Sequence, residues 1–186
     1  MKTYTHEELN TIIENHQHWL RKDCDGWENM RADLKGADLS YANLSCVDLS
    51  CVDLSDVDLS HTILSYANLR FAKNIPFIPY ACPDTGSFIG YKRANVHIVK
   101  LEIPSDARRC SATGRKCRCD KAKVLSIQFL DENIPCDDEE VASNFDRSFI
   151  YRVGEIVEEP NFDENRWNEC ARGIHFFINR QEAVEY

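Results

Sequence analysis

Basic residues are concentrated between Ser105 and Lys123, in a chain of 186 residues whose formal net charge is −9. This stretch contains seven lysines and arginines but only two acidic residues, so its local charge is +5 (7 − 2). Guanidinium groups bind phosphates and carboxylates through paired hydrogen bonds, and the hydroxyls and N–H groups of a turn add further donors. We therefore predict that these residues bind an anion such as a nucleotide: Arg108, Arg109, Ser111, Thr113, Arg115, Lys116 and Arg118.

The same basic residues have a structural alternative, which is the commoner role for such a cluster. They could form ion pairs with the acidic segment 137–140 or with aspartates in the N-terminal half of the chain. The sequence contains no GxxxxGK[ST] phosphate loop and no GxGxxG dinucleotide fingerprint. Ordinary nucleoside triphosphate and dinucleotide sites are therefore unsupported, whereas an anion site and structural ion pairs both stay open.

A second group of residues could supply catalytic or metal-binding side chains. Cys170 and His175 could act as nucleophile and base in an enzyme that acts on a phosphorylated or nucleotide substrate. Cys110, Cys117 and Cys119 could instead bind zinc with His175, although Cys-x-Cys differs from the CxxC spacing of structural zinc sites. No orienting acid or oxyanion-stabilising motif accompanies them. We therefore expect no metal, no cofactor, and a binding protein rather than an enzyme.

Both groups lie in the segment 82–186, which we expect to be a small β-rich or α+β domain. Runs rich in Val, Ile, Phe and Tyr predict strands over 87–93, 97–103, 124–129, 148–153 and 174–178, with Gly and Pro between them. The segment 131–144 holds six acidic residues and is expected to be an exposed loop. Asn179 followed by Glu182 predicts a capping box that opens a final short helix.

A leucine recurs every five residues from Leu34 to Leu69. A small or β-branched residue precedes each leucine by two positions, Asp or Asn nearly always stands between, and Ser usually follows. A period of five fits neither a helix nor a strand, so it indicates a stacked repeat. The leucines are expected to fill a narrow axis that has no room for larger side chains.

Units such as 42–45, which read Ala-Asn-Leu-Ser, resemble the A(D/N)LSx units of the pentapeptide-repeat family. The resemblance implies a short right-handed quadrilateral β-helix over 31–74, with about two coils of four pentapeptides. Residues twenty positions apart should then stack, for example Asp38 beneath Asp58 and His61 over Tyr41. The aromatic residues Tyr41 and Phe71 should face outward.

Residues 5–21 are predicted to form an amphipathic helix, because Thr5 and Glu8 make a capping box ahead of an apolar stripe. With the turn up to residue 30, this helix is expected to cap the open end of the repeats. His16 on its apolar face is expected to be structural. The chain is therefore predicted to be mainly β, with domains at 1–30, 31–74 and 82–186.

The whole arrangement resembles small proteins of phages and related mobile elements, in which a domain of unassigned function follows pentapeptide repeats. The segments 86–92, 98–104, 111–118 and 173–177 carry this likeness. We therefore predict a non-catalytic, phage-type binding protein whose basic loop binds an anionic, nucleotide-like small molecule or a protein partner, and so interferes with a host system.

Several partners are disfavoured by length and composition. A DNA-mimicking topoisomerase inhibitor is a weaker alternative, because two coils rise only about 10 Å and a duplex turn spans about 34 Å. We expect no duplex nucleic acid partner. No apolar run approaches the length of a membrane span and no signal peptide is apparent, so a cytoplasmic protein without a membrane partner is expected. Homo-oligomers are left open.

Overall fold

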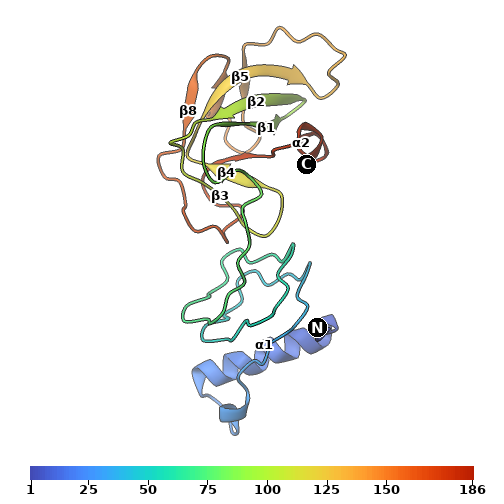
Figure 1. Cartoon of the computed structure of the whole chain (residues 1–186), viewed down its shortest axis with the longest axis vertical. Helices are drawn as coiled ribbons and strands as arrows, with labels where there is room; N and C mark the ends of the chain where they lie inside the picture. The colour runs from blue at the N-terminus through green and yellow to red at the C-terminus, as the bar shows by residue number, and fades with distance from the viewer. The chain divides into compact units, whose positions relative to one another are not determined.

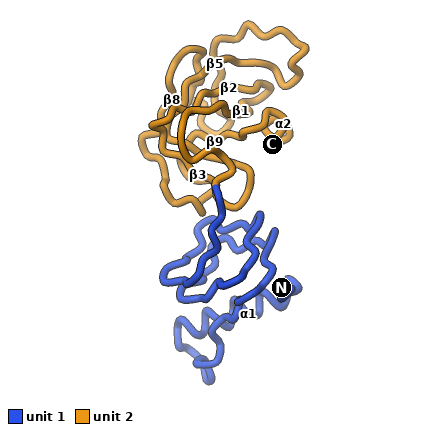
Figure 2. Tube along the Cα trace, in the orientation of Figure 1, with its two compact units in different colours: residues 1–79 blue, residues 80–186 orange.

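The computed structural model describes all 186 residues, from Met1 to Tyr186. The chain divides into two compact units, Met1–Pro79 and Tyr80–Tyr186, which we call the N-terminal and C-terminal units (Figure 2). Each unit contains its own set of buried apolar side chains. No helix in either unit is long and apolar enough to span a membrane.

The N-terminal unit begins with helix α1 (His6–Arg21), followed by a short 3-10 helix, η1 (Trp27–Asn29). The predicted capping box is confirmed, because Glu8 N donates to Thr5 Oγ1 at 3.2 Å and Thr5 N donates to Glu8 Oε2 at 2.8 Å. These bonds satisfy backbone donors that the first turn of a helix otherwise leaves without partners. The helix therefore starts where the sequence predicts.

Helix α1 packs against the repeats through His16, whose side chain is fully buried. His16 Nε2 lies 3.0 Å from the carbonyl oxygen of Ser50, and His16 Nδ1 accepts a hydrogen bond from Ala32 N at 3.3 Å. Because a carbonyl can only accept, Nε2 carries the proton and the ring is neutral. Burial lowers the pKa of His16 and so favours this neutral form. His16 is structural, as predicted.

The repeat leucines line the interior of the N-terminal unit. Leucines from Leu34 to Leu64 are buried, and Leu69 is half-buried. Leu39 N donates to the carbonyl oxygen of Asp58 at 3.0 Å, and a parallel bridge joins Asp38 with Asp58. Residues twenty positions apart therefore pair, as the repeat predicts.

Each pentapeptide bends at the residue two positions after its leucine, which we call the corner residue. The corner residues have φ angles between 57° and 67°: Gly36, Tyr41, Cys46, Cys51, Asp56, His61, Tyr66 and Phe71. Where Asp or Asn precedes the leucine, its side chain stabilises the bend. For example, Asp38 Oδ1 accepts hydrogen bonds from Ser40 N at 3.0 Å and Ser40 Oγ at 2.6 Å. The Asp or Asn side chains of most units thus stabilise the turns, while the leucines fill the interior.

The corner side chains face outward, as predicted. Tyr41 and Phe71 are 75% and 74% exposed. The rings of Tyr41 and His61 are stacked with their centroids 4.7 Å apart, which confirms the pairing expected from the twenty-residue spacing.

The C-terminal unit contains three antiparallel sheets and a short helix (Figure 1). The largest sheet has the strand order β1-β2-β5-β8: β1 (Phe88–Ala94), β2 (His97–Ile103), β5 (Lys121–Phe129) and β8 (Ile156–Glu158). The second has the order β3-β4-β9: β3 (Arg109–Ser111), β4 (Cys117–Cys119) and β9 (Ile174–Phe176). Strands β6 (Glu140–Ala142) and β7 (Ile150–Arg152) form a hairpin, and helix α2 (Arg180–Glu185) ends the chain.

Buried side chains from both larger sheets, including Val124 and Phe176, form one apolar core. The chain after β9 also reaches β1, where Tyr91 and Phe177 exchange two backbone hydrogen bonds of 2.8 Å. A Cβ atom at Gly90 would lie 2.7 Å from Phe176 Cδ2. Glycine at this position therefore allows the Phe176 ring to pack directly on the backbone of β1.

The strand predicted over 97–103 is confirmed with its exact bounds, and the one predicted over 87–93 is shifted by one residue, but the other three differ in length. Strand β5 begins at Lys121 rather than 124, and the strands predicted over 148–153 and 174–178 shorten to three residues each. The prediction of one exposed loop over 131–144 is wrong at its C-terminal end. There β6 pairs with β7, because Val141 is buried opposite Tyr151.

The capping box predicted at helix α2 is also wrong. Asn179 Oδ1 does accept a hydrogen bond from Gln181 N at 2.8 Å. The Glu182 carboxylate does not close the box, because it binds Arg115 at 2.8 Å instead. The helix start is therefore capped by one side chain rather than by a reciprocal pair.

Candidate functional site

A cavity of about 670 Å³ opens within the C-terminal unit. Its walls come from β1, the β6–β7 hairpin, the segment that leads into β9, and the C-terminal residue Tyr186. Aromatic side chains contribute much of the apolar lining: Phe145, Phe149, Tyr151, Phe177 and Tyr186. The size and mixed lining are typical of a site for a small molecule, since such pockets span roughly 300–1,000 Å³.

Lys92 is the most unusual residue of this cavity. In β1 it occupies an inward position between Gly90 and Ala94, and it is only 9% exposed. Its ammonium group lies 5.8 Å from the ring centroid of Tyr151 but forms no hydrogen bond or ion pair. Burial lowers the pKa of Lys92 to about 8. The fold thus places a poorly solvated amine against the cavity without a carboxylate to neutralise it.

Lys116 supplies a second amine from the turn before β4. Its Nζ lies 3.5 Å from Cys170 Sγ and 3.3 Å from the Tyr186 hydroxyl. Burial lowers the pKa of Lys116, but Tyr186 and Cys170 outweigh this effect, so the net shift is upward. Lys116 is therefore a stable cation at neutral pH.

His175 is neutral and held by the backbone. Its Nε2 lies 3.1 Å from the carbonyl oxygen of Glu169, so Nε2 carries the proton. Burial, together with the positive charges of Lys92 and Lys116, lowers the pKa of His175 to about 3. The imidazole adds no charge to the cavity near neutral pH.

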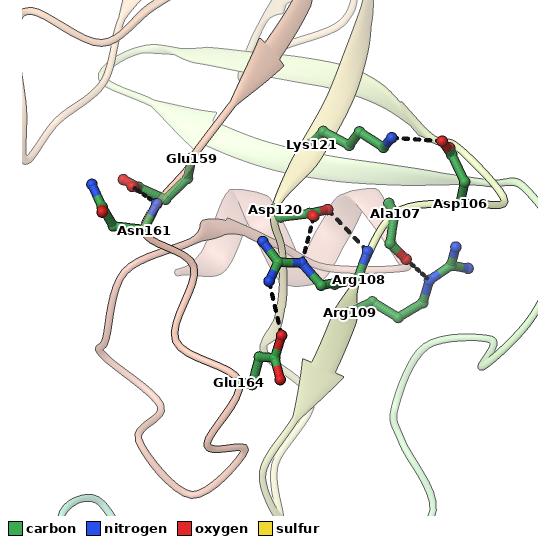
Figure 3. A network of polar contacts seen from close by, with 9 residues as sticks. All are labelled: Asp106, Ala107, Arg108, Arg109, Asp120, Lys121, Glu159, Asn161 and Glu164. Atoms are coloured by element: carbon green, nitrogen blue, oxygen red, sulfur yellow. Dashed lines mark hydrogen bonds and ion pairs between the residues drawn. The ribbon is translucent and has the colours of Figure 1, made fainter.

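The acidic residues that line the cavity do not neutralise its amines. Asp146 Oδ1 accepts a hydrogen bond from Ser148 N at 2.9 Å, and Glu159 Oε1 accepts one from Asn161 N at 2.9 Å (Figure 3). Both carboxylates therefore stabilise turns of their own segments. Neither forms an ion pair with Lys92 or Lys116.

Of the residues predicted to bind an anion, only Lys116 lines the cavity. Arg108 forms ion pairs of 2.8 Å with Asp120 and Glu164 (Figure 3). Arg115 is likewise paired, with Glu182 at 2.8 Å. The alternative of ion pairing is thus correct for these two arginines. Its proposed partners are wrong, because neither the segment 137–140 nor the repeat aspartates are involved.

The two remaining arginines of the predicted anion site are buried and bind backbone carbonyls. Arg109 donates to five of them: Pro83 and Gly86 at 3.5 and 2.8 Å, Pro104 and Ser105 at 2.6 and 3.0 Å, and Ala107 at 3.0 Å. Arg118, 2% exposed, donates to those of Asp163, Asn165 and Arg172 at 2.9–3.0 Å. Their guanidinium groups hold loops in place, so neither serves an external phosphate.

The hydroxyl residues of the predicted anion site also lie outside the cavity. Ser111 is buried, and its Oγ accepts a hydrogen bond from Ala81 N at 2.8 Å. Thr113 is half-buried on the turn between β3 and β4. The predicted cluster of hydroxyls and arginines around one anion is therefore not formed.

The predicted zinc ligands point to two different faces of one sheet. In the register of β3, β4 and β9, Cys110 is opposite Arg118, and Arg118 is opposite His175. Cys117 and Cys119 flank Arg118 and so face the other way, into the apolar core. Four ligands split in this way do not converge on one ion. The zinc alternative is wrong for this set.

Cys170 and His175 both line the cavity, but they do not form a nucleophile–base pair. The Cys170 thiol contacts Lys116, and His175 binds the Glu169 carbonyl instead. A histidine whose pKa lies near 3 is also a poor base at neutral pH. The geometry therefore gives no support to the predicted enzyme alternative.

Two other side-chain groups bring potential metal ligands within 4.8 Å of one another. They are His18 with Asp23 and Cys24, and His97 with Cys136 and Asp138. In each group a histidine nitrogen already contacts an aspartate, at 2.6 and 2.7 Å. These contacts are ordinary ion pairs or hydrogen bonds, and neither group belongs to the cavity.

The chain combines a region of five-residue repeats with a second, β-rich unit that contains the cavity. A model of pentapeptide repeats matches residues 31–56 and 53–73, in eight copies. A model described as a family of unknown function, DUF5758, matches residues 78–183, and the chain belongs to this family. No curated protein and no solved structure matches the chain.

Replacing Lys92 by Met should stabilise the protein at pH 7. The pKa of Lys92 is about 8 in the folded state and 10.5 ordinarily, so the unfolded chain binds more protons between these pH values. Wild-type stability should therefore rise across this window, and at pH 7 the buried charge should cost roughly 1–3 kcal/mol. Urea unfolding of both proteins at pH 7 and pH 10 provides the measurement. An equal stabilisation at both pH values would contradict a charge effect.

Proposed function

We propose that the C-terminal unit binds a small anionic molecule with an apolar portion in the cavity lined by Lys92 and Lys116. The observation that carries this proposal is Lys92, a residue only 9% exposed whose side chain borders the cavity without a carboxylate partner. A buried charge is costly unless it is paired. A bound anion supplies the missing partner, and its binding free energy offsets that cost.

The rest of the lining fits the same ligand class. Lys116 places a second positive charge in the cavity, and the neighbouring aromatic rings offer apolar contacts. A carboxylate or phosphate group attached to a ring or short chain would satisfy both parts of this surface. We therefore propose that the anion binds in the cavity rather than at the site predicted between residues 108 and 118. Lys116 belongs to both sites.

For the N-terminal unit, we propose that residues 31–74 form a right-handed quadrilateral β-helix that serves as a rigid platform. Backbone hydrogen bonds and parallel bridges between residues about twenty positions apart support this proposal. The role in binding requires no phage origin, which stays a prediction from sequence resemblance.

Binding of simple aryl anions tests the proposed function. Benzoate and phenyl phosphate should raise the melting temperature of the protein, because a ligand that binds only the folded state stabilises it. Lys92→Met and Lys116→Met should each weaken binding at least about tenfold, the effect of losing one charge-assisted hydrogen bond. The measurement is isothermal titration calorimetry.

Lys121→Met is the matched control for both variants. Lys121 lies outside the cavity and pairs with Asp106 at 2.6 Å (Figure 3). Its replacement should leave the affinity for both anions unchanged. Equal affinities in the wild type and all three variants, or no binding of either anion, would overturn the proposal.

A further inference from the structure

We propose that Lys92 forms an imine with the carbonyl group of an anionic aldehyde or keto acid held in the cavity. This inference rests on the proposed anion-binding function and adds a covalent step to it. It concerns Lys92, a lysine that is only 9% exposed, borders the cavity and has no hydrogen-bond or ion-pair partner.

The position of Lys92 suits a nucleophilic amine. The residue lies within β1, which pairs with β2 along its whole length, so its backbone is held firmly. No hydrogen bond or ion pair engages its Nζ, and the Tyr151 ring lies beside it. Once deprotonated, the nitrogen can therefore direct its lone pair at a carbonyl carbon in the cavity without first breaking a contact.

The surroundings also favour the neutral amine, which is the form that attacks a carbonyl. Burial and the nearby charge of Lys116 oppose protonation of Lys92, and the pKa of about 8 leaves about one amine in ten neutral at pH 7. An ordinary exposed lysine has about one in 2,500. Desolvation next to another cation is an established way to activate a lysine nucleophile.

The two lysines can thus divide the work between them. Lys116 keeps its proton, because Tyr186 and Cys170 raise its pKa against the effect of burial. It can pair with the carboxylate or phosphate of the ligand while Lys92 meets the carbonyl group. Two like groups whose pKa values are driven apart by their environments are typical of a division between binding and chemistry.

The step balances without any added oxidant, reductant or metal. The Lys92 nitrogen bonds to the carbonyl carbon and gives a carbinolamine. The C–O bond then breaks, and the oxygen departs as water with two protons that came from the amine. A C=N double bond joins Lys92 to the ligand, and hydrolysis reverses the reaction.

Reductive trapping with 4-formylbenzoate tests this inference. The probe carries a carboxylate for Lys116, an apolar ring, and an aldehyde for Lys92, and sodium cyanoborohydride converts the imine to a stable secondary amine. Intact mass and peptide mapping should show one addition, at Lys92, formed at least tenfold faster than at any other lysine. Lys92→Met and Lys92→Arg should abolish this fast addition, and Lys116→Met should slow it. Lys121→Met should leave it unchanged.

Terephthalate separates failure of the imine from failure of the binding site. It replaces the aldehyde of the probe by a second carboxylate, so it can bind but cannot react. If terephthalate raises the melting temperature while labelling is spread evenly over surface lysines, the imine is excluded and the binding function stands. If terephthalate has no effect and labelling is uniform, both proposals fail.

Discussion

Arg118→Ala should destabilise the C-terminal unit by roughly 3–5 kcal/mol. The buried guanidinium donates to the carbonyls of Asp163, Asn165 and Arg172, and a hydrogen bond made by a charged group contributes about 1.5–3 kcal/mol. The same bonds fasten the segment 163–172, which includes Cys170 of the cavity wall, to strand β4. The free energy of unfolding, measured with urea, and the affinity for benzoate should therefore both decrease.

Arg115→Ala is the matched control, because Arg115 lies three residues away and forms a single ion pair with Glu182. Its side chain is 54% exposed, and an exposed pair contributes at most about 1 kcal/mol. Arg118→Lys should recover only part of the loss, since one ammonium cannot reproduce the planar donors of a guanidinium. Equal stabilities of the Arg115→Ala and Arg118→Ala proteins would show that the carbonyl contacts contribute little.

Leu54→Ala should destabilise the N-terminal unit by roughly 2–5 kcal/mol, the usual effect of emptying a packed position. Leu54 is fully buried, and leucines from neighbouring pentapeptides surround the same interior. With only eight repeats, little remains to compensate for such a cavity. Hydrogen exchange should increase throughout 31–73, because the repeat backbone groups pair with one another.

Ile63→Ala serves as the control for that experiment. Ile63 precedes a buried leucine but is itself 41% exposed. Its replacement by alanine therefore removes apolar atoms only from the outer face of the repeats. Its replacement should change the free energy of unfolding by less than about 1 kcal/mol. A similar loss of unfolding free energy in both variants would contradict the structure, in which Leu54 points inward and Ile63 points outward.

The repeats could be predicted closely because each residue type acts locally. The leucine packs inward, and the Asp or Asn and the Ser form hydrogen bonds within the same turn. The five-residue period therefore also predicts which residues pair at a separation of twenty positions. Helix α1 could be predicted equally well, since Thr5 and Glu8 form hydrogen bonds with one another. By contrast, β3, β4 and β8 contain three residues each and are too short to show a period.

The candidate site could not be predicted in the same way. The charge density around Arg118 is visible in the sequence, but its carbonyl partners lie about 45–54 positions away. Lys92 resembles an ordinary surface lysine of a strand, and only the pairing of β1 decides which face encloses a cavity. The positions of Gly90 and Ala94 on that same face are the one hint that the sequence offered.

At the left-handed corners of the repeats, the backbone conformation does not depend on which side chain is present. Tyr, Cys, Asp, His and Phe all occupy corner positions with nearly the same φ angle, although left-handed backbone ordinarily disfavours most of these residues by roughly 1–2 kcal/mol. The interior leucines and the bonded Asp–Ser pairs therefore tolerate very different side chains at the corner. The corner residues could therefore be substituted one at a time without changing the backbone. The repeats thus offer an engineering scaffold for displaying chosen side chains at regular intervals.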